Sequence, residues 1–279
     1  MIKINKISIA TLAAAGLVFC STSAFADGAP FVDQNPIVVA NNEVGIAATG
    51  TLMNYQEHIT PGPSDTESGW MPGFAVKYSL MGDYFGSMPS NMYFAIHYQF
   101  SSGSIAYKGS VGGTPYDGTD DATTNRATAR LGKGFSLSND MMITPYVAGG
   151  YQDWNRDLQG PYGYVEDYHS GLIGAGVMFQ YAINPRLVIG ANLEGLAMIG
   201  GGMTPHIYNG ILGSASFDTS GQEKIGADID YRVFSQWHFY GGLRYTHFNY
   251  TGGPLKYGAF EPSSSTNLFS MDAGVAYHF

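Results

Sequence analysis

The chain has 279 residues and carries 22 acidic side chains against 13 Lys and Arg, a formal net charge of −9. Proteins that bind nucleic acid present a basic surface, so this balance argues against DNA or RNA as a partner. With 38 Gly, 20 Tyr and 16 Phe, the composition is also unusual for a soluble enzyme.

The first 26 residues have the pattern of a secretory signal peptide. Two lysines precede an apolar run over residues 7–20, which is too short to span a bilayer. Ala24 and Ala26 then form the small-x-small pattern that a signal peptidase cleaves. We therefore expect export with cleavage after Ala26, and a periplasmic N-terminal extension over residues 27–42.

The single cysteine, Cys20, lies inside that apolar run. A lipoprotein signal needs a small residue directly before the acylated cysteine, and Phe19 stands there instead, so acylation is the less favoured alternative. Cleavage after Ala26 leaves a mature chain with no thiol, no disulfide and no Cys-based metal site. We expect no cofactor.

Beyond the signal, no stretch approaches the ~20 apolar residues of a membrane helix. Apolar residues instead alternate with small or polar ones, as on a strand that faces lipid on one side. One such apolar face consists of Ile225, Ala227, Ile229, Tyr231 and Val233. The opposite face of the same segment consists of Lys224, Gly226, Asp228, Asp230 and Arg232. Strands can cross a bilayer only when they close into a barrel, because every backbone group must be paired.

Ten segments show this alternation, and the connections between them are alternately long and short. The predicted strands are 43–57, 70–81, 91–106, 122–137, 142–153, 166–182, 186–198, 221–233, 238–250 and 266–279. The long connections are 58–69, 107–121, 154–165, 199–220 and 251–265. Outer-membrane barrels have long outer loops and short periplasmic turns. The sequence therefore predicts an all-β fold over residues 43–279, a closed antiparallel up-and-down transmembrane β-barrel with both ends in the periplasm.

The last predicted strand carries the most specific signal. Its outward face consists of Phe269, Met271, Ala273, Val275, Tyr277 and Phe279. This pattern resembles the terminal signature of outer-membrane barrels, which implies that Tyr277 and Phe279 are recognised by the barrel-assembly machinery. Segment 143–151 is similar to one in small barrels of the opacity-protein and outer-membrane β-barrel-domain group. Many of those barrels have eight strands, so eight strands remain the alternative to ten.

The tryptophans are expected to mark the two membrane interfaces, where an apolar ring with a polar tip is favoured. Trp70 and Trp154 fall at the predicted outer rim, and Trp237 falls at a periplasmic turn. In the first predicted strand, 43–57, the sequence does not decide which set of alternate residues faces lipid, because both Leu52 and Met53 are suited to the lipid-facing position.

The inward faces of the predicted strands are rich in charge. Their ionisable residues are Lys77, Arg130, Lys224, Arg232, Arg244, Glu194, Asp228, Asp230 and Asp272. Barrels of about eight strands are nearly filled by side chains, whereas open pores have about 16–18 strands. We therefore favour an ion-paired network that fills the lumen, with a narrow channel for ions or small solutes as the alternative.

Histidines and acids gather toward the predicted outer rim, which raises the possibility of an outer-membrane enzyme. They are His58, His169, His206, His247, Asp153, Asp157, Glu166 and Asp167. Omptin proteases use Asp and His on a ten-stranded barrel to activate water, and lipid A deacylases use a His–Ser pair.

The spacing of these residues does not support either catalytic site. His169 and Ser170 are adjacent on a strand and point to opposite faces, so they cannot form a base and its nucleophile. Thr246 stands beside His247 where a deacylase would need its serine. Since no two histidines share metal-ligand spacing, we expect neither a catalytic site nor a metal site.

The sequence thus predicts a non-enzymatic integral outer-membrane protein that serves envelope integrity or surface interaction through its long loops. Its expected partners are outer-membrane lipid and lipopolysaccharide, the assembly machinery, and an extracellular ligand bound by the loops.

Overall fold

The computed structural model describes residues 35–59, 64–83, 90–111 and 114–279, without the side chain of Tyr208. The predicted signal peptide, its cleavage residues Ala24 and Ala26, and the first part of the predicted periplasmic extension lie outside these residues. Within the described residues, no helix is long and apolar enough to span a bilayer.

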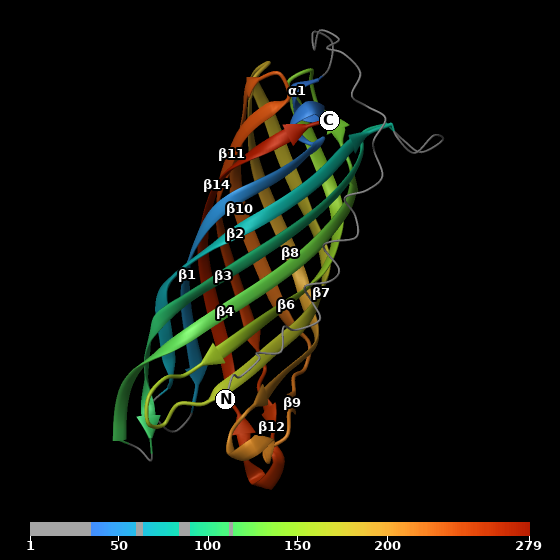
Figure 1. Cartoon of the computed structure of the whole chain (residues 1–279). Helices are drawn as coiled ribbons and strands as arrows, with labels where there is room; N and C mark the ends of the chain where they lie inside the picture. The colour runs from blue at the N-terminus through green and yellow to red at the C-terminus, as the bar shows by residue number, and fades with distance from the viewer. Residues whose placement is uncertain (1–34, 60–63, 84–89, 112–113) are drawn as a thin grey trace. The chain divides into compact units, whose positions relative to one another are not determined.

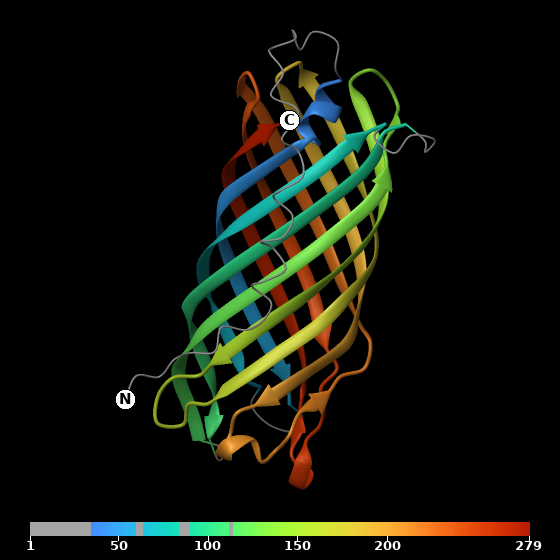
Figure 2. The same ribbon diagram turned by 45° about the vertical axis from the view of Figure 1, so that its right-hand side comes forward.

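Ten long strands form one closed antiparallel barrel (Figures 1 and 2). They are β1 (Glu43–His58), β2 (Thr66–Gly82), β3 (Met92–Val111), β4 (Thr114–Lys133), β6 (Met141–Asp157), β7 (Val165–Asn184), β8 (Leu187–Pro205), β10 (Ser220–Phe234), β11 (Trp237–Tyr250) and β14 (Ser263–His278). The last strand pairs with both β11 and β1, and this second pairing closes the sheet. The predicted fold class and strand number are confirmed.

The remaining elements are short and lie near the ends of the barrel. They are α1 (Pro36–Ala40), β5 (Phe135–Ser136), β9 (Ala215–Ser216), β12 (Gly253–Pro254) and β13 (Phe260–Glu261), with 3₁₀ turns at Tyr208–Gly210 and Lys256–Gly258. Figure 1 shows α1 beside the end of β14, and β9 and β12 at the opposite end. We call these the terminal end and the loop end of the barrel.

The outer wall carries an apolar belt that lies toward the terminal end. Outward side chains there are about half exposed, as for Ile46 at 56%, Val147 at 60% and Leu243 at 52%. In β1 the belt includes the even-numbered residues, because Met53 is only 1% exposed and points inward. Toward the loop end the outward residues become polar, as in Asn54, and the barrel therefore continues past the apolar belt.

The prediction of a long loop at 107–121 is wrong, because most of it is strand. β3 runs to Val111 and β4 begins at Thr114, and the two pair over their whole length. β2 and β8 also extend further toward the loop end than predicted. Outside the belt a strand contacts water rather than lipid, so the apolar alternation by which strands were recognised disappears there.

Candidate functional site

The lumen of the barrel is the best candidate for a functional site, and it consists of four layers. At the terminal end, α1 is inserted into the barrel. Its residue Ile37 is fully buried. After the helix, the Asn41 side-chain amide donates to Gln180 of β7 at 2.7 Å, and the Asn42 amide donates to the Met81 carbonyl of β2 at 2.7 Å. Because β2 and β7 lie on different sides of the barrel, these bonds fix α1 across the opening.

Next to α1 lies a chamber with a volume of ≈ 220 Å³, which has room for several water molecules. Its wall contains most of the lumen charges. The cations are Lys77, Arg126, Arg130, Lys224 and Arg244. The acids in or next to the wall are Glu43, Asp153, Glu194, Asp228, Asp230 and Asp272.

One acid, Glu194 of β8, joins three cations of the chamber wall. Its carboxylate lies 2.6 Å from Arg130, 2.9 Å from Lys224 and 3.8 Å from Arg126. The Tyr146 hydroxyl also donates to it at 3.1 Å. These contacts link β4, β6, β8 and β10 through one carboxylate, which therefore connects strands on different sides of the lumen.

Two further ion-pair groups lie along the rest of the wall, from β10 to β2. Arg244 of β11 bonds both Asp272 and Asp228, the latter at 2.9 Å. Lys77 of β2 lies 2.5 Å from Glu43 of β1. Each cation is thus matched by an acid from a different strand, as expected where isolated charge would be costly.

An aromatic layer closes the chamber on its loop-end side. Trp154 lies between Tyr55 and Tyr168, with ring centroids 4.9 Å and 5.0 Å away, and Tyr168 lies 5.4 Å from Tyr250. Since β1 and β7 are five strands apart around the barrel, these rings reach across the lumen. The prediction that Trp154 lies in the lipid interface is wrong: it is 4% exposed and points inward.

Beyond the rings, Arg156 of β6 is surrounded by acids from three other strands. It lies 2.5 Å from Glu67, 2.6 Å from Glu166 and 3.2 Å from Glu57. Arg156 is 1% exposed, so this group is almost free of water. It spans β1, β2, β6 and β7 and joins opposite sides of the lumen, which closes the loop end.

Glu261 of β13 connects the outer loops to this acid–arginine group. The Tyr168 hydroxyl donates to Glu261 at 2.6 Å. Burial, reinforced by the negative charge of Glu166, raises the pKa of Glu261 to about 9. Glu261 is therefore protonated at neutral pH, which reduces the repulsion among the acids around Arg156.

The structure brings most of the predicted lumen residues together in the chamber wall, but not Arg232. Arg232 lies at the terminal end and donates to the Pro185 carbonyl at 3.1 Å.

Tyr277, which was predicted as part of the assembly signal, faces outward, with its ring 5.4 Å from that of Trp237. Sequence reasoning missed Arg126, although it is in phase with Arg130 on β4.

Sequence reasoning also missed Arg156, Glu43 and His238. Arg156 lies beyond the predicted end of its strand at residue 153, where no alternation indicated that the strand continues. Glu43 is the first residue of β1, and His238 is the second residue of β11. Whether a side chain at the end of a strand points into the lumen can be decided only when the pairing register of that strand is known.

The rim histidines do not converge on one site. His206 pairs with Asp167 at 2.7 Å, and both side chains are about half exposed. His247 lies 2.9 Å from the Asn267 side chain, and His58 is exposed at the end of β1. Asp153 accepts a hydrogen bond from Asn125.

The acids and hydroxyls near these histidines are divided between the two faces of the wall. Glu166 and Ser170 point into the lumen, whereas His169 points outward. Among the described residues, neither His206 nor His247 shares a hydrogen bond with a serine or threonine. The described rim therefore contains an Asp–His pair but no assembled nucleophile and base.

No family model matches the sequence, and comparison with curated proteins finds no match. Among solved structures, the outer membrane protease OmpT of Escherichia coli aligns with a TM-score of 0.53 at 9% identity, covering 85% of this chain and 95% of that one. Neisserial surface protein A aligns with a TM-score of 0.35 at 12% identity, covering 85% and 97%. Ail of Yersinia pestis aligns with a TM-score of 0.31 at 13% identity, covering 86% and 99%. At 9% identity the likeness to OmpT establishes the barrel fold and nothing about activity.

Proposed function

We propose that this protein is a non-conducting, non-enzymatic barrel of the bacterial outer membrane that supports envelope integrity and presents its loop end to the outside for surface interaction. The observation that carries the proposal is the layered filling of the lumen. The inserted helix α1, the aromatic layer and the Arg156 group each cross the barrel in turn. A solute would have to displace all of them to pass.

The direction of insertion is inferred from the positions of α1 and of the end of β14. α1 and the end of β14 lie at one end (Figure 1), and short turns connect the strands there, as between Asn184 and Leu187. In outer-membrane barrels that end faces the periplasm. The loop end then projects from the cell surface. The resemblance of the last strand to an assembly signal, through Tyr277 and Phe279, remains a prediction.

Surface interaction is supported by apolar side chains in the outer loops. Tyr257 is 79% exposed, Phe260 is 63% exposed and Ile211 is 49% exposed. The two loops that carry them touch, because the Lys256 amide donates to the Leu212 carbonyl at 2.8 Å. Large apolar side chains that contact neither lipid nor core are typical of binding surfaces.

Electrical recording from the refolded mature protein in planar bilayers tests the closed lumen. We expect no steady conductance. A matched variant that lacks residues 35–42 but keeps all ten strands removes α1 and should stay closed, because the aromatic layer and the Arg156 group remain. Steady openings of the wild-type protein would refute the proposal and favour the narrow channel, for which the polar chamber is the supporting observation.

An enzyme is the second candidate, because His206 and Asp167 form an exposed pair at the loop end. Incubation of the folded protein with lipopolysaccharide and with basic peptides tests this candidate. We expect neither to be cleaved. Cleavage by the wild-type protein that is lost in both His206→Gln and Asp167→Asn would establish an enzyme instead.

A further inference from the structure

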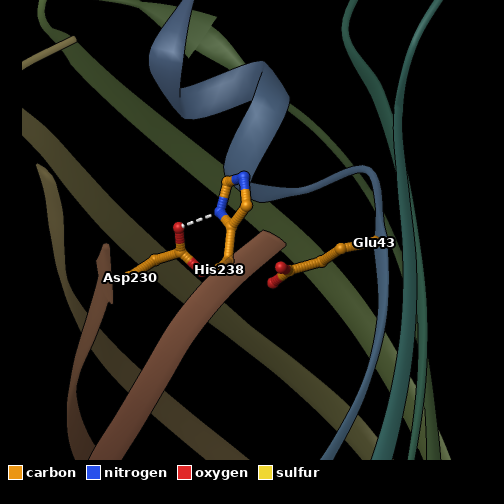
Figure 3. Close-up of side chains that lie close together, drawn as sticks. All are labelled: Glu43, Asp230 and His238. Atoms are coloured by element: carbon orange, nitrogen blue, oxygen red, sulfur yellow. Dashed lines mark hydrogen bonds and ion pairs between the residues drawn. The ribbon is translucent and has the colours of Figure 1, made fainter. Parts of the chain in front are cut away.

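Three ionisable side chains from three strands meet beside α1, at the terminal end of the lumen. They are Glu43 of β1, Asp230 of β10 and His238 of β11 (Figure 3). One ligand atom from each lies within 4.8 Å of the other two. Asp230 and His238 already meet, since Nδ1 of the imidazole lies 2.5 Å from Oδ1 of the carboxylate.

Each of these side chains has one atom held by a neighbour and a second buried atom without a partner. Lys77 bonds Oε1 of Glu43 at 2.5 Å, which leaves Oε2 without a hydrogen bond. Oδ2 of Asp230 and Nε2 of His238 are likewise unpartnered. Glu43 is 1% exposed and His238 is 2% exposed, so bulk water does not satisfy these atoms.

Figure 3 shows the Glu43 carboxylate pointing toward the Asp230–His238 pair from the other side of the group. Unpaired buried polar atoms are costly, and three of them in one small group indicate that a partner is missing there. Two carboxylates and one ammonium carry a net charge of −1 when the imidazole is neutral. The missing partner is therefore a cation.

We propose that Glu43, Asp230 and His238 bind one divalent cation of the zinc type. Zinc accepts imidazole nitrogen together with carboxylate oxygen, whereas calcium and magnesium take oxygen ligands. The ion replaces the proton between His238 and Asp230, and side-chain shifts of about 1 Å bring the three ligands to the ~2.0–2.2 Å that zinc requires. Water completes the four-coordinate shell.

The position of the ion indicates its role. Glu43 directly follows Asn41 and Asn42, which hold α1 in place. The ion joins this start of β1 to β10 and β11, which are not its neighbours in the sheet. It therefore stabilises the closed terminal end of the barrel. Lys77 orients Glu43, as hydrogen-bonding partners behind metal ligands commonly do.

Zinc titration of the refolded, untagged mature protein tests the site after removal of metals by a chelator. We expect one Zn²⁺ per chain by calorimetry and by metal analysis, together with a higher unfolding temperature. His238→Gln and Glu43→Gln should each weaken Zn²⁺ binding at least tenfold. The matched control, His247→Gln, lies on the same strand but faces outward and should bind as the wild type does.

Cobalt spectroscopy of the wild-type protein provides a test that does not depend on the folding of any variant. Co²⁺ at this site should give the visible absorption of a four-coordinate ion, and Zn²⁺ should displace it. Absence of these bands, or Zn²⁺ binding that is equal in all the variants, would show that the three side chains form only an ion-pair group. Binding of Ca²⁺ in preference to Zn²⁺ would also overturn the proposal.

Discussion

Two charge groups in the lumen have the same arrangement with the signs of the charges reversed. In the Arg156 group, one cation is shared by Glu57, Glu67 and Glu166. In the Glu194 group, one acid is shared by Arg126, Arg130 and Lys224. They differ in their contact with water. The Arg156 group lies on the loop-end side of the aromatic layer, and its side chains are at most 7% exposed. The cations of the Glu194 group border the chamber and are 12–19% exposed.

The comparison indicates that the same arrangement of charges has different consequences in dry and in hydrated surroundings. A buried charge that loses its partner cannot be rehydrated in the Arg156 group, whereas the chamber beside the Glu194 group has room for water to solvate its cations. We therefore expect the central residue of the dry group to matter more for stability than that of the hydrated group.

Arg156→Met should have the largest effect, because it leaves three buried acids without a cation. We expect a loss of about 3–5 kcal/mol in the free energy of unfolding in lipid or detergent. Denaturant titration followed by tryptophan fluorescence measures this loss. Arg186→Met removes an exposed arginine at the β7–β8 turn and is the control. Equal stability of the two variants would contradict the assignment of the Arg156 group as a closing layer.

Glu194→Gln should have a smaller effect of about 1–3 kcal/mol, because the amide keeps part of the hydrogen bonding and water reaches the three cations. The same denaturant titration gives the value. An effect larger than that of Arg156→Met would reverse the comparison and indicate that the chamber is dry.

The outer loops should be less well protected at high pH because of Glu261. Its folded-state pKa of about 9 lies above the ordinary glutamate pKa of 4.5, so its contribution to stability is complete below pH 4.5 and disappears as pH rises through about 9. We expect hydrogen exchange at residues 253–261, corrected for intrinsic rates, to increase about a hundredfold between pH 7 and pH 10, because protection falls tenfold per pH unit from pH 7 to about pH 9 and levels off above it. Glu261→Gln should abolish most of this dependence, and an unchanged profile in that variant would assign it to another group.

Tyr168→Phe should have the smallest effect. It removes the hydroxyl that donates to Glu261 at 2.6 Å and to Glu166 at 3.1 Å, but keeps the ring in the aromatic layer. We expect a loss of about 0.5–1.5 kcal/mol in the free energy of unfolding, with the lumen still closed. Conductance in this variant would mean that the hydroxyl, rather than the ring, closes the lumen.

The fold could be predicted because lipid imposes a simple rule on the outer wall. Each crossing strand must alternate between apolar and inward-facing residues, and segments such as Ile225 to Val233 show this alternation directly in the sequence. The rule also assigned Lys77, Arg130 and Glu194 to the inward face. It failed at 107–121 because those residues lie past the apolar belt, where water contacts the wall and polar residues are tolerated on both faces.

The sequence by itself therefore determined the closed barrel and the inward direction of most lumen charges, and it favoured ten strands over eight. Only the tertiary structure decided which charges meet. Arg156 reaches Glu67 across 89 residues of chain, and Asp230 and His238 face Glu43 from strands that do not pair with β1. Alternation is a local property of one strand, whereas contacts across a lumen depend on the register and closure of all the strands, and no single segment encodes these.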